Sequence, residues 1–290
     1  MIGIILALLA SAALGLGAVL VRKRLDESNV LNATVILNLV GNIILWPLAL
    51  LFTNLGTISL EGVLFFAIAG VLAPGIFRLL YYKGMETVGT SANASIYATY
   101  PMYSSIFAVL LLNEILTITN WIGIICIVLG VVLIERSLYK PKTENSRFLR
   151  KGLAISIATA LVVAFAQIIR KYGLSIFNEP MLGNAIGYAN GFLITLLFLI
   201  FSQAKRNLSA LRKDFQLFWK AGVALSIGWI LAFYALSNER VSIVTPILQT
   251  EVLFVHLFAY IYLKELEQIS SKLVICALII VLGITLVGIR

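Results

Sequence analysis

Long apolar stretches separated by short polar segments run along the whole chain. In windows of about 19 residues, ten of these stretches approach the roughly 20 residues that a helix needs to cross a bilayer. We predict helices at residues 3–21, 32–53, 60–80, 90–112, 119–135, 152–169, 181–202, 218–237, 242–263 and 271–289. No short alternating strands typical of a membrane barrel are visible. The pattern therefore predicts an all-α polytopic membrane protein with ten transmembrane helices.

Composition agrees with this class. Hydrophobic residues make up 61% of the chain and charged residues 12%, about half the charged share of a soluble domain. The net charge of +9 does not indicate nucleic-acid binding, because the basic residues lie in short loops where they bear on orientation and lipid headgroups. We expect a multi-pass protein of the cell membrane, plasma or inner, with the lipid bilayer as a partner and no nucleic-acid partner.

The two cysteines, Cys126 and Cys276, both lie inside apolar stretches. Neither a CxxC motif nor a Cys/His spacing typical of a metal site is present. We therefore expect no disulfide, no metal ion and no cofactor.

Two sequence patterns occur twice. GLGAVLVRKRL, at 15–25, aligns with VAFAQIIRKYGL, at 163–174, with Arg22-Lys23 opposite Arg170-Lys171. Further along, the stretch 81–114 aligns with 233–265, at an offset of 151 or 152 residues. The second pair ends in Glu114 and Glu265, for which helix capping or loop hydrogen bonding is the first interpretation.

The repeating unit contains five helices. Because five is odd, the second copy crosses the membrane in the opposite sense, which gives an inverted repeat, a layout common among secondary transporters. We expect a first repeat at 1–135, holding helices 1–5, and a second at 152–290, holding helices 6–10. The polar segment 136–151, with Pro141, is the predicted linker.

Both halves share one order of features: an aromatic pair, a polar turn, small residues, a proline, a long apolar run, a glutamate and a Gly-bearing helix. This order resembles the EamA-type branch of the drug/metabolite transporter superfamily over essentially the whole chain. The resemblance implies that helices 3, 4, 8 and 9 line a central cavity, supported by helices 5 and 10. The family often has a proline in the fourth helix of each half. Pro101 fits, but its counterpart is Val252, and we expect Pro246 to supply the second bend.

The orientation of the chain in the membrane has two possible answers. The loops after helices 1, 3, 5, 7 and 9 hold 18 of the 22 Lys and Arg residues, so the positive-inside rule places both termini outside. The family resemblance implies that both termini lie inside.

The apolar stretch 247–262 carries Glu251 and His256, the only histidine. A charge at bilayer depth costs at least a few kcal/mol, and isolated ionisable groups there usually mark a pathway. Glu251 is either a protonated structural group or a substrate-binding group that also exchanges a proton. His256 lies about 140° around the helix from Glu251. It is a candidate proton relay or an interhelical donor, and no direct pair with Glu251 is expected.

One face of the fourth predicted helix carries Asn93, Tyr97, Tyr100 and Ser104, at spacings i, i+4, i+7 and i+11. An offset of 151 residues makes Glu251 the counterpart of Tyr100. We therefore predict that Asn93, Tyr97, Tyr100 and Glu251 face one cavity and bind substrate.

The third and eighth predicted helices carry aromatic residues at matching positions, with Phe77 opposite Trp229 and Tyr81 opposite Phe233. Tyr81, Trp229 and Phe233 are candidate substrate-binding residues, because aromatic faces around a carboxylate attract organic cations. The alternative is ordinary packing or interfacial anchoring. Arg78 either binds an anionic group at a bent helix or extends to the headgroups.

These features favour a secondary transporter that moves a small organic metabolite, an amino-acid-like compound or an organic cation, by alternating access, with proton coupling as an option. No P-loop is present, and the two aspartates, Asp26 and Asp214, lie in loops. The alternative is a membrane-embedded enzyme or a lipid-handling protein. A monomer and a homodimer both fit the sequence.

Overall fold

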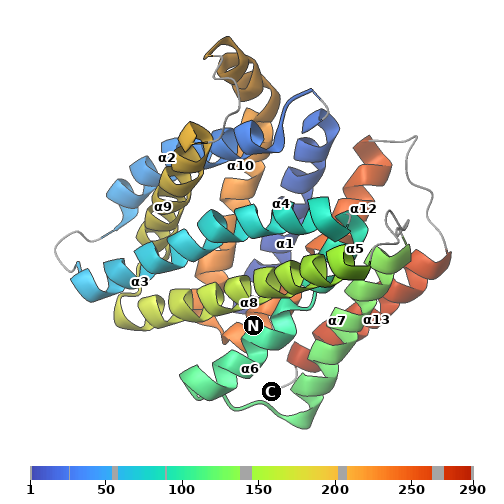
Figure 1. Ribbon diagram of the computed structural model, residues 1–290. Coiled ribbons are helices and arrows are strands. Elements are labelled where there is room, and N and C mark those ends of the chain that lie inside the picture. The colour runs from blue at the N-terminus through green and yellow to red at the C-terminus, as the bar shows by residue number, and fades with distance from the viewer. Residues whose placement is uncertain are drawn as a thin grey trace.

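The computed structural model describes residues 2–25, 27–53, 58–88, 90–137, 146–201, 208–262 and 271–288. Within these ranges the chain is helical and has no strand, which confirms the all-α class. The elements, shown in Figure 1, are α1 (Ile2–Leu25), α2 (Val30–Phe52), α3 (Leu60–Gly70), the π-helical turn η2 (Val71–Ile76), α4 (Phe77–Val88), α5 (Thr90–Tyr97), α6 (Tyr100–Leu112), α7 (Ile118–Ser137), α8 (Ser146–Ile176), α9 (Pro180–Phe201), α10 (Leu208–Asn238), α11 (Val241–Gln249), α12 (Glu251–Tyr262) and α13 (Ser271–Gly288).

Seven helical stretches are long and apolar enough to cross a membrane. They are Ile2–Leu25, Val30–Phe52, Leu60–Met85, Lys151–Ile176, Pro180–Phe201, Arg212–Asn238 and Val241–Tyr262, and three shorter apolar helices accompany them at Tyr100–Leu112, Ile118–Ile134 and Ile275–Gly288. Large apolar side chains cover the outside, with Leu51 77% and Leu278 64% exposed. An exposed apolar surface of this kind suits lipid contact and is rare on soluble monomers.

Two helices begin earlier than the apolar pattern predicts. α8 starts at Ser146, inside the predicted linker, and α10 starts at Leu208, ten residues before the predicted stretch. A helix pairs its backbone groups within itself, so it continues past the apolar run into polar sequence. Of the predicted linker, residues 138–145 lie outside the described ranges.

The third predicted helix is interrupted at Pro74. A proline inside a helix cannot donate to the residue four before it, and its ring crowds that turn. The chain responds with the π-helical turn η2, where Ala73 has non-helical dihedral angles (φ −144°, ψ 118°). The interruption leaves the Ala73 carbonyl available to a side chain from another helix.

The fourth and ninth predicted helices are each interrupted at a threonine. Thr99 separates α5 from α6, and Thr250 separates α11 from α12. Each threonine hydroxyl donates to the carbonyl three residues back, on Ile96 or Ile247, at 2.6 Å, a side-chain bond that competes with the regular ladder.

The bend expected at Pro246 therefore lies elsewhere. Pro246 is inside α11, and the interruption comes four residues later. The predicted position was wrong, because the break between α11 and α12 coincides with the hydrogen bond from the Thr250 hydroxyl to the Ile247 carbonyl and not with Pro246.

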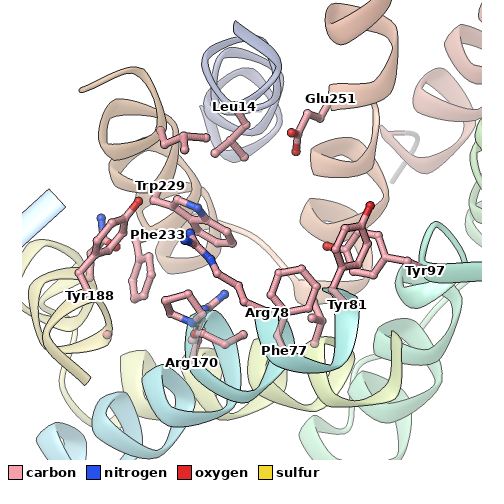
Figure 2. A pocket seen from close by; sticks show the side chains of 16 residues that line it. Leu14, Phe77, Arg78, Tyr81, Tyr97, Arg170, Tyr188, Trp229, Phe233 and Glu251 are labelled. Atoms are coloured by element: carbon pink, nitrogen blue, oxygen red, sulfur yellow. Dashed lines mark hydrogen bonds between the residues drawn. The ribbon is translucent and has the colours of Figure 1, made fainter. Parts of the chain in front are cut away.

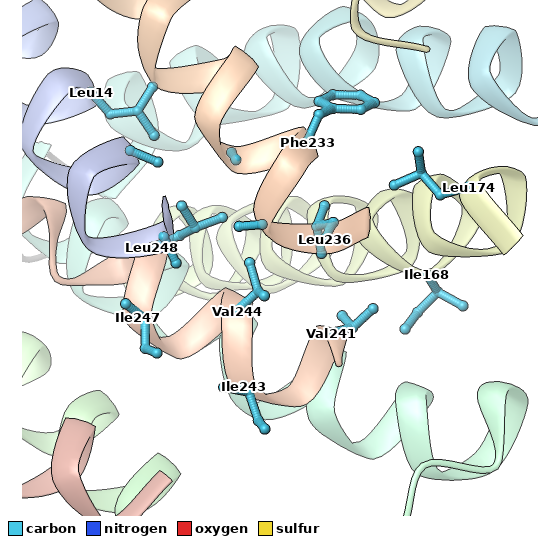
Figure 3. Close-up of a cluster of buried hydrophobic side chains, with 14 of the residues drawn as sticks. Leu14, Ile168, Leu174, Phe233, Leu236, Val241, Ile243, Val244, Ile247 and Leu248 are labelled. Atoms are coloured by element: carbon cyan, nitrogen blue, oxygen red, sulfur yellow. The ribbon is translucent and has the colours of Figure 1, made fainter. Parts of the chain in front are cut away.

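The nine residues of α11 are all buried. Figure 3 shows Val244 and Leu248 of this helix on the side toward Leu236 of α10 and Leu14 of α1, and Ile243 and Ile247 on the opposite side. Since its polar residues are buried as well, α11 lies in the interior of the bundle. Five of its nine residues belong to the main buried hydrophobic cluster.

Glycines allow two pairs of helices to approach closely. Side chains added at Gly123 of α7 and Gly283 of α13 would each lie 2.7 Å from the carbonyl oxygen of the other glycine, so these backbones touch directly. Figure 1 shows α7 and α13 side by side at one edge of the bundle. Between α3 and α9, a methyl group on Gly70 would lie 2.7 Å from the Cα of Gly187. Small residues at such crossings are a common solution in membrane bundles.

We expect Gly70→Ala to destabilise the protein by about 1–3 kcal/mol, since overpacking a close contact costs that much. Gly187→Ala is the matched control at the same crossing, because its added methyl group would meet nothing within 4 Å. Thermal unfolding of the detergent-purified variants should show a lower midpoint for Gly70→Ala alone. Equal midpoints for the two variants would mean that this crossing does not limit the packing of α3 against α9.

Candidate functional site

A cavity of about 250 Å³ lies among α1, α4, α5, α8, α9, α10, α12 and η2 (Figure 2). Its lining combines aromatic rings, two arginines and one carboxylate. The lining includes Phe77, Arg78, Tyr81, Tyr97, Arg170, Asn184, Gly187, Tyr188, Trp229, Phe233 and Glu251. A mostly apolar cavity with a few convergent polar groups is the usual form of a small-molecule site.

Three aromatic rings form one wall. Phe77 and Tyr81 come from α4, and Tyr97 comes from the end of α5. The centroid of Phe77 lies 5.6 Å from that of Tyr81 and 5.3 Å from that of Tyr97, and the two tyrosine rings are 5.3 Å apart. These separations are typical of favourable aromatic pairs, so each ring fixes the orientation of the others.

Arg170 of α8 organises the opposite wall. Its guanidinium donates to the Ala73 carbonyl, which the η2 interruption exposes, and to Gln167 Oε1 at 3.0 Å. The guanidinium carbon lies 4.8 Å from the Trp229 ring centroid and 5.5 Å from that of Phe233. A buried arginine is tolerated when its donors are paired and its flat face stacks on aromatic rings. Arg170 therefore joins α8, η2 and α10.

Glu251 is the first residue of α12, directly after the Thr250 interruption, and its carboxylate points into the cavity (Figure 2). Within the part of the chain that the structure describes, this side chain makes no ion pair and no hydrogen bond. Its charge acts through space on Tyr97 and Tyr100. The partial positive charge at a helix N-terminus interacts favourably with a carboxylate at this position. Glu251 is thus an ionisable group that faces the cavity.

Two predicted residues do not line the cavity. Tyr100 is 4% exposed and stacks behind Tyr97, with ring centroids 5.3 Å apart. Asn93 donates to the Tyr81 carbonyl (3.1 Å) and accepts from Ser156 Oγ (2.6 Å). The predicted face assumed one continuous helix, but the turn at residues 98–99 changes the helical phase before Tyr100. Tyr100 and Asn93 support the aromatic wall from behind, and a direct contact of either with substrate stays a prediction.

His256 also lies outside the cavity lining. Its Nδ1 is 2.8 Å from the Val252 carbonyl, and its Nε2 is buried without a hydrogen-bond partner among the described residues. No contact joins it to Glu251, in keeping with their different faces of α12. A relay role for His256 stays a prediction.

Comparison with known proteins identifies the family. The sequence profile of the EamA-like transporter family matches residues 1–136 and 150–289. The chain belongs to the EamA-like transporter family. It is an integral multi-pass membrane protein, and its family places it among transporters of small molecules.

Individual relatives extend this family match. An "Uncharacterized transporter" of Archaeoglobus fulgidus is 24% identical over 289 residues, which cover 99% of this chain and 98% of the relative. "Uncharacterized protein MJ1333.1" of Methanocaldococcus jannaschii is 29% identical over 134 residues, which cover 46% of this chain and 96% of the relative. A solved crystal structure superposes with a TM-score of 0.80 at 12% identity, covering 98% of this chain and 94% of the other, and shows a shared fold.

Among the lining residues of this EamA-family site that sequence analysis missed, three have polar side chains: Arg170, Asn184 and Tyr188. Arg170 served only to align the repeats, because the predicted sixth helix ended one residue before it. The signal was present, since α8 continues to Ile176 and places Arg170 inside a stretch that can cross the membrane. Asn184 and Tyr188 follow at i, i+4 on α9 but carry no charge to draw attention.

We expect Arg170→Lys to cost about 1.5–3 kcal/mol of stability, the range for hydrogen bonds to a charged group. Lysine keeps the charge but cannot reproduce the fork of donors or the stacking on Trp229. Arg22→Lys is the matched control, because the sequence RK at Arg22 aligns with the same sequence at Arg170 and the Arg22 side chain is exposed. Thermal unfolding midpoints of the purified variants check this, and an unchanged midpoint for Arg170→Lys would contradict the role given to Arg170.

Proposed function

We propose that this EamA-family protein is a secondary transporter for a small organic metabolite, an amino-acid-like compound or an organic cation, and that it works by alternating access. The observation that carries the proposal is Glu251. A carboxyl group that has no hydrogen bond or ion pair with any described residue faces a cavity walled by aromatic rings, at the interruption of an apolar helix. A fixed charge at such depth is costly unless a ligand or a proton uses it.

Alternating access calls for two similar halves, and several observations support ten helices arranged as two inverted five-helix repeats. The family profile matches twice, over 1–136 and 150–289. The M. jannaschii relative has about the length of one such match. The interruptions at Thr99 and Thr250 occupy equivalent positions, each three residues after an isoleucine. An inverted repeat places one site at the interface of the halves, near mid-membrane.

Direct contacts join the proposed halves at α6 and α11, and we propose that they close one end of the cavity. α6 packs against α11, and Ser104 Oγ lies 2.6 Å from Thr245 Oγ1. Glu114 accepts from the backbone amides of Val241 (2.8 Å) and Ser242 (3.1 Å) and from the Ser242 hydroxyl. This carboxylate caps the N-terminus of α11, as expected for a capping role.

The equivalent helix pair at the other end is α5 and α12. Among the described residues no comparable packing joins these two helices. Glu265, the repeat counterpart of Glu114, lies outside the described ranges. Contacts between the proposed halves at one helix pair and not at its counterpart are consistent with a single state of an alternating-access cycle.

Proton coupling follows from the chemistry of one carboxylate. A cationic substrate and a proton both bind the charged form of Glu251, so each displaces the other. Exchange of the two across the membrane then needs no second acid. His256, on another face of α12, takes part in this exchange only if protons reach Glu251 through its side chain.

We expect Glu251→Gln to weaken cation binding by about tenfold to a hundredfold, the equivalent of one charge-assisted hydrogen bond. In the wild type, acidification should weaken cation uptake, because protons compete for the carboxylate, and in Glu251→Gln uptake should no longer vary with pH. Uptake into proteoliposomes at several pH values measures both effects.

His256→Gln is the control for this experiment. It should keep the wild-type pH dependence, and loss of pH dependence in that variant alone would move the proton site to the other face of α12. If Glu251→Gln transports like the wild type at every pH, the role of Glu251 is structural and the proposal fails.

A second prediction concerns the closed end. Glu114→Ala removes the cap of α11, and losing a cap costs about 0.5–2 kcal/mol. We expect this change to open the closed end roughly 2- to 30-fold more often. The measurement is maleimide labelling of Thr245→Cys, a buried reporter, in a background with Cys126→Ser and Cys276→Ala. Glu61→Ala, at an exposed acidic residue in the first turn of α3, is the control. Equal labelling with and without Glu114→Ala would show that Glu114 does not hold this end closed.

A further inference from the structure

Three buried polar atoms of residues that line the cavity have no hydrogen-bond partner among the described residues: Arg78 Nη1, Asn184 Nδ2 and Tyr188 Oη. They make up three of the seven such side-chain atoms among the described residues, and the other four belong to residues outside the cavity lining. Leaving one buried donor unpaired is unfavourable, and native proteins rarely do so without a reason. Three unpaired atoms around one space indicate a ligand that pairs with them.

The chemistry of the three groups selects an anion. A guanidinium and an amide nitrogen can only donate hydrogen bonds, and a tyrosine hydroxyl donates readily. Arg78 lies near enough to Tyr188 for its charge to act on the Tyr188 hydroxyl. The Ser226 hydroxyl also lies near Tyr188 and donates to the Gly222 carbonyl (2.7 Å), but no hydrogen bond joins it to Tyr188 Oη. One positive charge with two neutral donors matches a carboxylate, which accepts several hydrogen bonds at two oxygens.

The protein itself does not supply that carboxylate. Glu251 is the acidic residue in the cavity lining, and it forms no ion pair with Arg78 or Arg170. The two arginines also differ in what they contact. Arg170 is held by Ala73, Gln167 and the Trp229 ring, whereas Arg78 Nη1 has no partner. Arg170 therefore positions the wall, and Arg78 is available to a ligand.

The donor residues are held rigidly on α9. Asn42 of α2 donates to the Tyr188 carbonyl at 3.1 Å. Gly41 leaves room for the Tyr188 ring, because any side chain at that position would overlap it. Asn184 and Tyr188 are 1% and 4% exposed. A site held on packed helices in this way needs little reorganisation when a ligand enters.

We propose that Arg78, Asn184 and Tyr188 form a carboxylate subsite, and that the substrate is a zwitterion whose ammonium group faces Glu251. Figure 2 shows Tyr188 and Glu251 on opposite sides of the cavity, with Arg78 extending from α4 into the space. The aromatic wall of Phe77, Tyr81 and Tyr97 adjoins the Glu251 side and accepts a cationic or apolar group. This inference rests on the proposed transport function and narrows its substrate from either an amino-acid-like compound or an organic cation to amino acids.

The test uses full-length protein in detergent and sets of three related compounds: an L-amino acid, the amine left by removing its carboxylate, and the acid left by removing its amine. One set is L-leucine, 3-methylbutylamine and 4-methylpentanoate, and the others cover the remaining side-chain classes. Thermal stabilisation against concentration gives each affinity. We expect at least one amino acid to bind at least tenfold more tightly than its amine and its acid.

Variants test whether the preference for the amino acid over its amine arises from the carboxylate subsite. Arg78→Gln and, as a conservative second change, Tyr188→Phe should reduce amino-acid affinity tenfold or more toward that of the amine, and leave amine affinity unchanged. Thr53→Val is the control, because Thr53 Oγ1 is also buried without a partner but lies outside the cavity lining.

The outcomes separate the two proposals. Amines that bind as tightly as their amino acids, in a Glu251-dependent way, overturn the carboxylate subsite and leave the transport function standing. Retention of the amino-acid preference in both subsite variants also overturns it. Tighter binding of phosphoethanolamine than of β-alanine would assign the donors to a phosphate instead. If no compound binds and none is transported, both proposals fail.

Discussion

A helix that is interrupted inside a bilayer must find partners for its freed backbone groups within the protein, because lipid offers none. Much of this structure is arranged around that constraint. The Pro74 interruption exposes the Ala73 carbonyl, and Arg170 pairs with it. Thr99 and Thr250 bond to carbonyls at their own breaks. The amides at the start of α11, which follows α10 after a short turn, are paired by Glu114.

The same interruptions place the chemical groups of the cavity. Arg170 lies in the cavity wall, where its guanidinium pairs with the Ala73 carbonyl at the broken helix. The same guanidinium stacks on the rings of Trp229 and Phe233, so these rings lie in the wall as well. Arg78 follows η2 directly, and Glu251 follows the Thr250 break. In uninterrupted helices, Arg78 and Glu251 would lie on the side of a regular turn and not next to a helix end. Breaks that cost hydrogen bonds thus coincide with the residues that face the cavity, as in transporters whose sites form at discontinuous helices.

The sequence was informative wherever a physical signal was local. Apolar length predicted the helices, and the cost of burying a charge singled out Glu251. Helical spacing singled out Tyr97, and the matching aromatic positions of the third and eighth predicted helices singled out Tyr81, Trp229 and Phe233; all four line the cavity. The same periodicity failed for Tyr100, since no residue pattern announced the turn at 98–99, and a proline was the wrong marker for the break at Thr250.

Sequence analysis missed other residues for a different reason. Arg170, Asn184 and Tyr188 matter because of what surrounds them, and none is unusual for its position along the chain. Whether a donor is paired depends on helices far away in sequence, such as η2 for Arg170. Arg78 was noticed, but choosing between an anion site and a headgroup contact required knowing that its neighbours are unpaired as well.

The reciprocal contact of Gly123 with Gly283 has a mechanical consequence. With no side chains between them, the carbonyl oxygen of each glycine sits against the backbone of the other helix. Val287 lies beside Gly123 and Ile127 lies beside Gly283, so each glycine also faces a larger residue of the other helix. Any side chain at either glycine would push the two backbones apart, so these two positions set the separation of α7 and α13. The crossing lies at one edge of the bundle (Figure 1), and no described residue of either helix lines the cavity.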